Sequence, residues 1–150
     1  MSHLVHHVTY FIKALSTAYM CRECLCELTV CVGPSMMPTF NPSGDVALVE
    51  RMVSCTMVRQ RPIQKGDVVI AKSVQNPRQS VCKRVLGLEG DVVCMDGDGH
   101  CVRVPKGHVW LQGDNVLNST DSRHYGPVPY STLQGRVVTK VYPTLSWKNL

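Results

Sequence analysis

The chain has 150 residues and a formal net charge of +5, and 44% of its residues are hydrophobic against 18% that are charged. This balance indicates one globular domain with a real core, and it excludes a disordered chain. Because no basic run is interleaved with aromatic residues, nucleic acid is not expected among the partners, and an anionic membrane surface accounts better for the mild positive charge.

Residues 1–31 differ from the rest of the chain, because their apolar residues recur at helical spacing from Val5 to Tyr19. A membrane-spanning helix needs about 20 predominantly apolar residues, and Lys13 interrupts this run. The segment is therefore predicted to be an amphipathic helix. It would be a poor membrane span, an interfacial or partner-docking segment, or a helix packed on its own domain. No small-residue cleavage site follows, so a removable signal peptide is not expected.

Eight cysteines are many for this length, and four of them gather at Cys21, Cys24, Cys26 and Cys31. The first two have the spacing of half a zinc site, but no second pair follows at the usual distance. We therefore expect no metal and no cofactor. Most cysteines are expected to be small buried apolar residues or free thiols, although an oxidising compartment could pair some of them.

A short, stiff segment with one small hydroxyl, that of Ser35, follows in the sequence GPSMMPT. Pro34 and Pro38 bracket it, and each proline restricts its own φ and biases the preceding residue towards an extended conformation. Such a segment holds a serine in one place, which a nucleophile needs and an ordinary surface serine does not. Ser35 is therefore the candidate nucleophile.

From Gly33 onward the pattern is one of strands and turns. Three segments begin with a Gly-Asp pair and continue as a β-branched run, which is the signal of a turn followed by a strand. Strands are predicted at 46–50, 68–72, 92–95, 101–104, 108–112 and 135–141. Residues 52–65 and 73–80 are predicted to be exposed loops, and 95–100 a hairpin turn with too few ligands for calcium. No linker divides this part, so we expect a mainly β fold with a single domain.

The stretch 80–86 is predicted to be a further strand that carries a candidate base, Lys83. Period-2 alternation places Lys83 on the same face as Val81 and Val85, in apolar surroundings. An ordinary lysine has a pKa near 10.4 and cannot accept a proton at neutral pH, whereas full burial lowers the pKa by about 3–5 units. The alternative is a lysine that extends from a strand edge into solvent, and the stretch by itself favours that alternative.

Three stretches in this order, GPSMMPTF, VCKRVLGLEGD and GDNVLNSTDSRHYGP, resemble three motifs of the type I signal peptidases, which are membrane-bound serine proteases with a Ser-Lys dyad. The resemblance covers about 33–143 and is strongest to mitochondrial members of the family. It implies an antiparallel β-rich catalytic domain at 32–150 and a retained anchor helix at 1–31. It also implies precursor polypeptides with hydrophobic sorting signals as substrates, on the intermembrane-space side of the mitochondrial inner membrane, and a second, related subunit as partner.

The resemblance also implies roles for individual residues. Ser35 would be the nucleophile and Lys83 its base, and Ser119 would form a hydrogen bond with the Lys83 ammonium. One position departs from the pattern, because some family members have a side-chain hydroxyl two residues before the nucleophile where this chain has Gly33. The oxyanion would then be bound mainly by backbone N–H groups, that of Ser35 first.

The polar run 113–127 is expected to be an ordered loop that supports these residues through its own hydrogen bonds. By resemblance, Asp121 and Arg123 support the site, with Arg84 as a second cation near the acid. A buried carboxylate needs a partner, so Asp121 is expected to pair with Arg84 or with Arg123. A different class of function stays open, namely an inactive peptide-binding β-domain that serves an active subunit. The presence of both Ser35 and Lys83 favours the enzyme.

Overall fold

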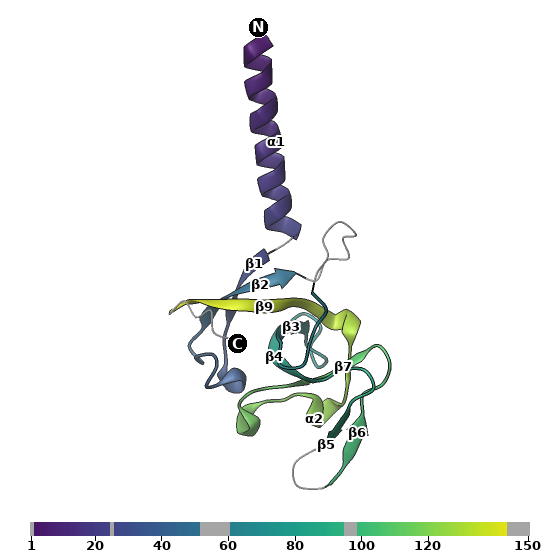
Figure 1. The fold of residues 1–150 in the computed structure, drawn as a ribbon. Coiled ribbons are helices and arrows are strands. Elements are labelled where there is room, and N and C mark those ends of the chain that lie inside the picture. The colour runs from purple at the N-terminus through teal and green to yellow at the C-terminus, as the bar shows by residue number, and fades with distance from the viewer. Residues whose placement is uncertain (1, 25, 52–60, 95–98, 144–150) are drawn as a thin grey trace.

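A computed structural model describes residues 2–24, 26–51, 61–94 and 99–143. Within these ranges a long helix stands at the N-terminus and a curled β-domain follows it (Figure 1). In chain order the elements are α1 (Ser2–Cys24), β1 (Cys26–Cys31), the 3-10 helix η1 (Pro34–Met36), β2 (Asp45–Arg51), β3 (Val68–Lys72), β4 (Ser80–Gly87), β5 (Val92–Cys94), β6 (Cys101–Arg103), β7 (His108–Gln112), η2 (Val116–Asn118), α2 (Ser122–Tyr125), β8 (Val128–Pro129), η3 (Tyr130–Thr132) and β9 (Leu133–Tyr142).

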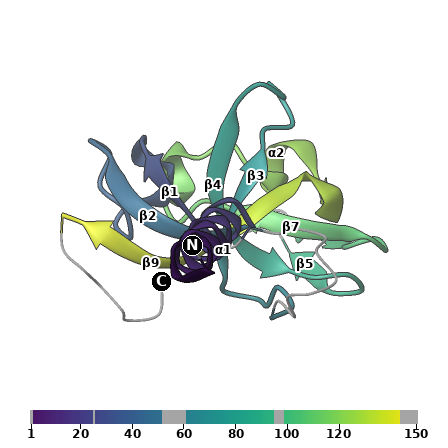
Figure 2. The ribbon, with the colours of Figure 1, turned by 90° about the horizontal axis from the view of Figure 1, so that it is seen from above.

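The larger sheet of the described chain has the strand order β1-β2-β9-β3-β4-β7-β8, and every pair in it is antiparallel. The short strands β5 and β6 form a separate hairpin. Seen along α1, the strands β1 and β2 lie on one side and β3, β4 and β7 on the other, with β9 running between them (Figure 2). Because a twisted sheet curls, the segment after β1 returns to β4, and η1 contacts that strand. The predicted mainly β, antiparallel fold is confirmed.

The core has two parts, which lie on opposite faces of β3. Val68 and Ile70 belong to a cluster with Met36 and Phe40 of the η1 segment. Val69 and Ala71 belong to the other cluster, which includes side chains of β4, β7 and β8. Both faces of β3 are therefore buried, which explains why its sequence is a continuous apolar run instead of an alternating one.

All the predicted strands are found, including the one that carries Lys83. Of the predicted loop at 73–80, residues 74–79 are exposed loop, whereas Ser80 is the first residue of β4. Most of the predicted loop at 52–65 and the centre of the predicted turn at 95–100 lie outside the described residues, which omit 52–60 and 95–98.

One prediction about the N-terminal segment is wrong, because residues 1–31 are not all helix. The helix ends at Cys24, and β1 pairs with β2 from Cys26 to Cys31. Thr29 and Val30 near the end of this segment are β-branched, and Cys31 is only 7% exposed, inside the core. The β-domain therefore begins at β1 and not at residue 32.

Helix α1 projects away from the β-domain and meets it near β1 (Figure 1). Its described apolar side chains, such as Phe11 and Leu15, are exposed, so the helix is not packed on its own domain along this part. None of the described helices combines the length and the apolar character that crossing a membrane requires. The expected anchor role is thus not confirmed.

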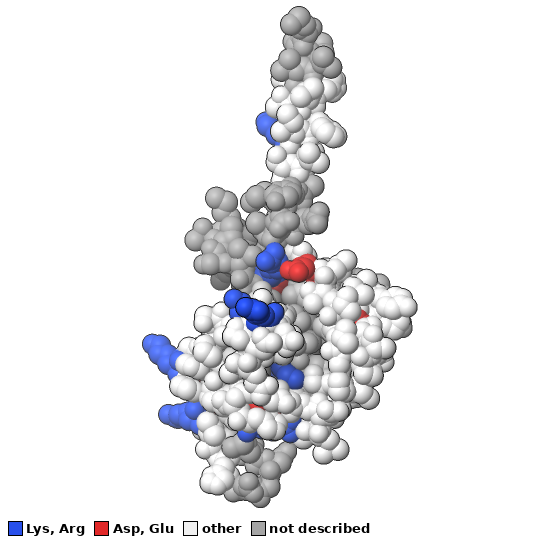
Figure 3. Space-filling model, turned by 180° about the vertical axis from the view of Figure 1, so that it is seen from behind, with Lys and Arg blue, Asp and Glu red and all other residues white. Residues whose placement is uncertain are grey.

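On the face seen from behind, basic side chains outnumber acidic ones (Figure 3). The rear face of the β-domain shows many Lys and Arg side chains and few acidic ones (Figure 3). This distribution agrees with the net charge of +5.

Candidate active site

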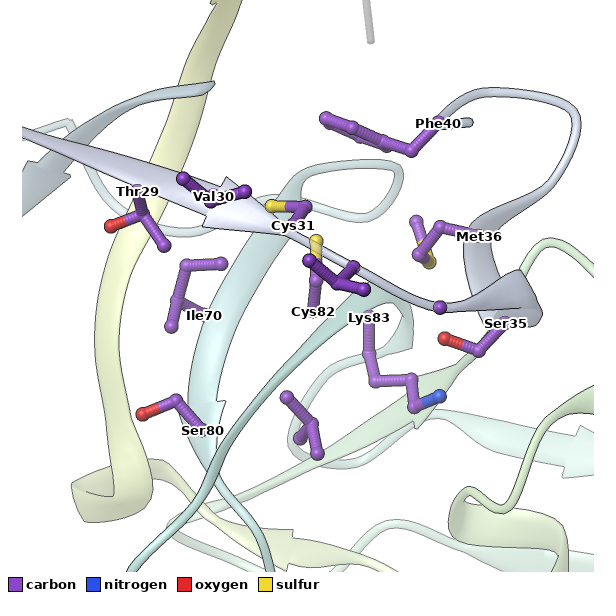
Figure 4. Close-up of a pocket in the computed structure, with 13 residues that line it drawn as sticks. Thr29, Val30, Cys31, Ser35, Met36, Phe40, Ile70, Ser80, Cys82 and Lys83 are labelled. Atoms are coloured by element: carbon purple, nitrogen blue, oxygen red, sulfur yellow. The ribbon is translucent and has the colours of Figure 1, made fainter. Parts of the chain in front are cut away.

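Ser35 and Lys83 line the same cavity, of about 280 Å³, between the two sides of the curled sheet. The end of β1 and the η1 segment form one wall, and residues 80–83 of β4 form the other. The Lys83 amine and the Ser35 hydroxyl are directed toward the same space from opposite walls (Figure 4). Ser35 and Lys83 are 48 positions apart in the sequence, and three strands lie between β1 and β4 in the sheet. The curl of the sheet therefore brings the two residues together.

The backbone around Ser35 is held as the two prolines predict. Gly33 precedes η1 with a φ of 114°, which L-residues rarely adopt, and its N–H donates to the Pro42 carbonyl at 3.1 Å. Pro34 occupies the first turn of η1, where its missing N–H does no harm. The buried Met36 and Phe40 then anchor the segment in the core, with the Phe40 N–H donating to the Met36 carbonyl at 2.9 Å.

Lys83 is buried, with only 4% of its surface exposed. It lies on the inner face of β4 with Val81 and Val85, so the alternative of a lysine extending into solvent is wrong. Its amine donates a hydrogen bond to Ser119 Oγ at 2.9 Å. Burial lowers the pKa of Lys83 below its ordinary value, and the negative charge of Asp121 partly opposes this shift.

Asp121 is fully buried and serves as the N-cap of α2. Its carboxylate accepts hydrogen bonds from Ser119 Oγ at 2.7 Å, from the Gly113 N–H at 2.9 Å and from Arg123 Nε at 2.8 Å. Burial by itself raises the pKa of Asp121, but the bonds from Arg123, Gly113 and Ser119 outweigh it and hold the pKa at about 2. A continuous chain of hydrogen bonds therefore runs from Lys83 through Ser119 and Asp121 to Arg123.

Arg84 pairs with Asp114 and not with Asp121. It donates to Asp114, from Nε at 2.8 Å and from Nη2 at 2.7 Å, and to the Gly66 carbonyl at 2.7 Å. The reason is alternation along β4, because Arg84 points to the opposite face from Lys83. Of the two pairings left open for Asp121, the Arg123 pair is therefore the one that forms. Arg84 is a cation of the neighbouring network, not of this carboxylate.

Sequence reasoning missed three residues that tie the Ser35 segment to the polar loop. Thr39 Oγ1 donates to Asp114, and Asn115 donates from Nδ2 to the Pro34 carbonyl and from its backbone N–H to the Ser35 carbonyl, both at 3.0 Å. For Asp114 and Asn115, the sequence signal was the GDN at the start of the third motif, which directly follows a buried strand.

Gly113 is a further point at which the loop and the Ser35 segment meet. A Cβ added there would lie 2.5 Å from the Ser35 carbonyl oxygen and would also overlap the Ser119 side chain. Only glycine therefore allows the two segments to approach this closely.

The described cysteines behave as small buried residues or free thiols, with one exception. Cys94 and Cys101 form a disulfide that joins β5 to β6, whereas Cys26, Cys31 and Cys82 are free. The side chains of Cys21 and Cys24 lie outside the described set. Within the described part of the chain, no group of three or more His, Cys, Asp or Glu side chains is arranged to hold a metal ion.

Comparisons with known proteins match most of the chain. The family model "Signal peptidase, peptidase S26" matches residues 4–102 and 98–142. Mitochondrial inner membrane protease subunit 1 of Xenopus tropicalis is 44% identical over 142 residues, covering 92% of this chain and 82% of that protein. The Homo sapiens subunit 1 is 42% identical over 140 residues, covering 91% and 81%. Mitochondrial inner membrane protease subunit 2 of Danio rerio is 39% identical over 123 residues, covering 79% and 65%.

A solved structure, a signal peptidase I from Enterococcus faecalis V583, matches with a TM-score of 0.45 and 23% identity, covering 52% of this chain and 98% of that one.

Proposed function

We propose, since this chain belongs to the signal peptidase family, peptidase S26, that it is a serine endopeptidase with Ser35 as nucleophile and Lys83 as general base. The observation that carries the proposal is the buried Lys83 amine, which faces the cavity it shares with Ser35. Burial lowers the pKa of Lys83, and only a neutral amine can accept the serine proton.

The reaction would begin when Lys83 Nζ takes the proton of Ser35 Oγ as that oxygen attacks the carbonyl carbon of a peptide bond. The oxyanion that develops would accept a hydrogen bond from the backbone N–H of Ser35, because Gly33 supplies no side chain for this role. The Lys83 ammonium would then give its proton to the leaving amine. Finally, Lys83 would activate the water that hydrolyses the acyl-enzyme.

The hydrogen-bond chain behind Lys83 would orient the amine. Because Lys83 Nζ donates to Ser119 Oγ, and Ser119 Oγ donates to Asp121, the amine is drawn to one side of the cavity. Its lone pair is then free to face Ser35. Arg123 balances the charge of Asp121, and the network of Arg84 with Asp114 holds the Ser35 segment against the polar loop. These residues would position the reacting groups and would not react themselves.

The substrate would bind as an added β-strand along the cavity. The cavity wall includes residues 29–33 of β1 and the chain after it, and β1 is an edge strand of the sheet. By similarity to the mitochondrial inner membrane proteases, we propose precursor polypeptides with cleavable hydrophobic sorting signals as substrates. The site would lie on the intermembrane-space side of the inner membrane. Relatives named subunit 1 and subunit 2 support a second, related subunit as partner.

Helix α1 would hold the chain at the membrane or at that partner, since its described apolar side chains are exposed. The basic surface would favour an anionic bilayer.

The test is cleavage of a precursor by the full chain, purified in detergent with and without the candidate partner subunit. Ser35→Ala and Lys83→Met should each abolish cleavage and leave the circular dichroism spectrum unchanged, and the double variant should be no worse than either single variant. If the Ser35→Ala complex cleaves as fast as the wild type, the other class of function is favoured, that of an inactive peptide-binding subunit.

A further inference from the structure

The wall of the cavity contains two free thiols beside the proposed dyad. Cys31 ends β1, four residues before Ser35, and Cys82 directly precedes Lys83 on β4. Both side chains line the cavity and pack in the same core cluster. The Cys82 sulfur is directed toward the Cys31 sulfur (Figure 4). Nothing in the proposed reaction uses either thiol.

We propose that Cys31 and Cys82 form a redox-reactive dithiol, which a small peroxide oxidises to a disulfide that blocks peptide binding in the cavity. The chemical part of this proposal stands on the two thiols alone, and its effect on cleavage rests on the proposed function.

The two thiols are suited to different parts of the reaction. A hydrogen bond from the Cys82 side chain lowers the pKa of Cys31, and the same bond, together with burial, raises the pKa of Cys82. Cys31 is therefore the better thiolate, and Cys82 holds its proton and attacks second. Cys26, also free, is exposed and lies outside the cavity wall, so it offers a control.

The chemistry requires one equivalent of hydrogen peroxide. The Cys31 thiolate attacks one peroxide oxygen, the O–O bond breaks, and the products are a sulfenic acid on Cys31 and a hydroxide that takes up a proton to become water. The Cys82 sulfur then attacks the Cys31 sulfur, the S–O bond breaks, and the departing hydroxide takes the Cys82 proton. In total, two thiols and one peroxide give one disulfide and two waters. Hydrogen peroxide is small beside a cavity of about 280 Å³.

The disulfide would join two strands that the sheet keeps apart. Strands β2, β9 and β3 lie between β1 and β4 in the larger sheet, but the curl of the sheet brings Cys31 and Cys82 into one core cluster at the wall of the cavity. A disulfide between them would fix the β1 wall to the β4 wall, so that an added substrate strand could no longer part these walls to enter the cavity. It would also restrain the backbone of Lys83, which is the neighbour of Cys82 in sequence.

The experiment uses the full chain, reduced, freed of reductant and then titrated with hydrogen peroxide. Peptide mapping by mass spectrometry without reduction detects a 31–82 link, and precursor cleavage is measured on the same samples before and after dithiothreitol. The link should form, cleavage should fall at least about tenfold, and dithiothreitol should restore it. In Cys82→Ser, the ratio of oxidised to reduced activity should stay near one, whatever its basal level. Cys26→Ser should be as sensitive as the wild type.

Three outcomes distinguish failure of the dithiol, failure of the cavity block and failure of the proposed function. If peroxide leaves Cys31 and Cys82 unlinked in the wild type, the dithiol is excluded, and this result needs no variant that might fail to fold. If the link forms while cleavage is unchanged, the disulfide does not block the cavity. If the reduced wild-type chain cleaves no precursor, the proposed function fails, and the peptide map alone then supports or overturns the dithiol.

Discussion

Replacing Asp121 with asparagine removes the buried negative charge behind Lys83 and Ser119 and leaves the size of the side chain almost unchanged. The wild-type carboxylate accepts hydrogen bonds from Ser119, from the Gly113 N–H and from Arg123. Asparagine can accept only part of this set and cannot balance the charge of Arg123. The substitution should therefore change both the stability of the fold and the protonation of Lys83.

The effect on stability follows from the pKa of Asp121, which is lowered from 3.8 to about 2. At 1.36 kcal/mol per unit, this shift corresponds to roughly 2 kcal/mol of stability at neutral pH. A chain of this length should then lose about 4–8 °C in Tm. Because the folded pKa is depressed, this contribution is present above the unfolded pKa of 3.8 and is lost as the pH falls towards 2. The difference between wild type and Asp121→Asn should shrink over that window.

The substitution lowers stability, but it should favour the neutral form of Lys83 that catalysis needs. The charge of Asp121 raises the pKa of Lys83, so its removal leaves burial to lower that pKa further. More Lys83 is then neutral at a given pH, and the acid limb of the profile of kcat/KM against pH should move to lower pH even though the protein is less stable. Asp91→Asn is the matched control, because Asp91 pairs with Lys65 and does not contribute to the pKa of Lys83.

Thermal unfolding between pH 2 and 7 and precursor cleavage between pH 5 and 10 would test both parts. An acid limb that stays in place or moves to higher pH in Asp121→Asn would show that Lys83 is not the group being titrated. An unchanged Tm at neutral pH would show that the buried carboxylate does not stabilise the fold.

Three further changes have definite expected outcomes. Ser119→Ala should lower kcat by about 10–100-fold with little change in KM, because it frees the Lys83 amine without touching the bound peptide; equal loss in both would indicate a role in binding. Gly113→Ala should cost about 1–3 kcal/mol in urea unfolding, since its Cβ would overlap the neighbouring segment; wild-type stability would mean that the loops can separate. Deleting 1–24 should leave the β-domain folded, whereas deleting 1–31 should destabilise it through the loss of β1. Equal amide-exchange protection in both truncations would contradict this.

Local sequence patterns predicted much of the fold and part of the site. Alternation along 80–86 placed Lys83 on the same face as Val81 and Val85, because a strand has only two faces, but the stretch by itself favoured a lysine that extends into solvent, and the structure was needed to show that Lys83 is buried. The same rule assigns Arg84 to the other face. The stiffness of the Ser35 segment was also visible, since proline restricts the chain whatever surrounds it. β1 was missed because it follows the helical stripe with no glycine or proline to mark a turn between them.

The sequence by itself determined most of the strands, the face of β4 that Lys83 shares with Val81 and Val85, and where the backbone around Ser35 is rigid, because these properties depend on neighbours a few residues away. Only the tertiary structure decided that Ser35 and Lys83 share a cavity, that Asp121 pairs with Arg123, and that Cys31 lies beside Cys82. The shared cavity and the cysteine pair depend on the curl and strand order of the sheet, in which three strands separate β1 from β4, whereas Asp121 pairs with Arg123 because Arg84 lies on the other face of β4 and bonds Asp114. No local period encodes that order, since it results from the packing of the whole domain.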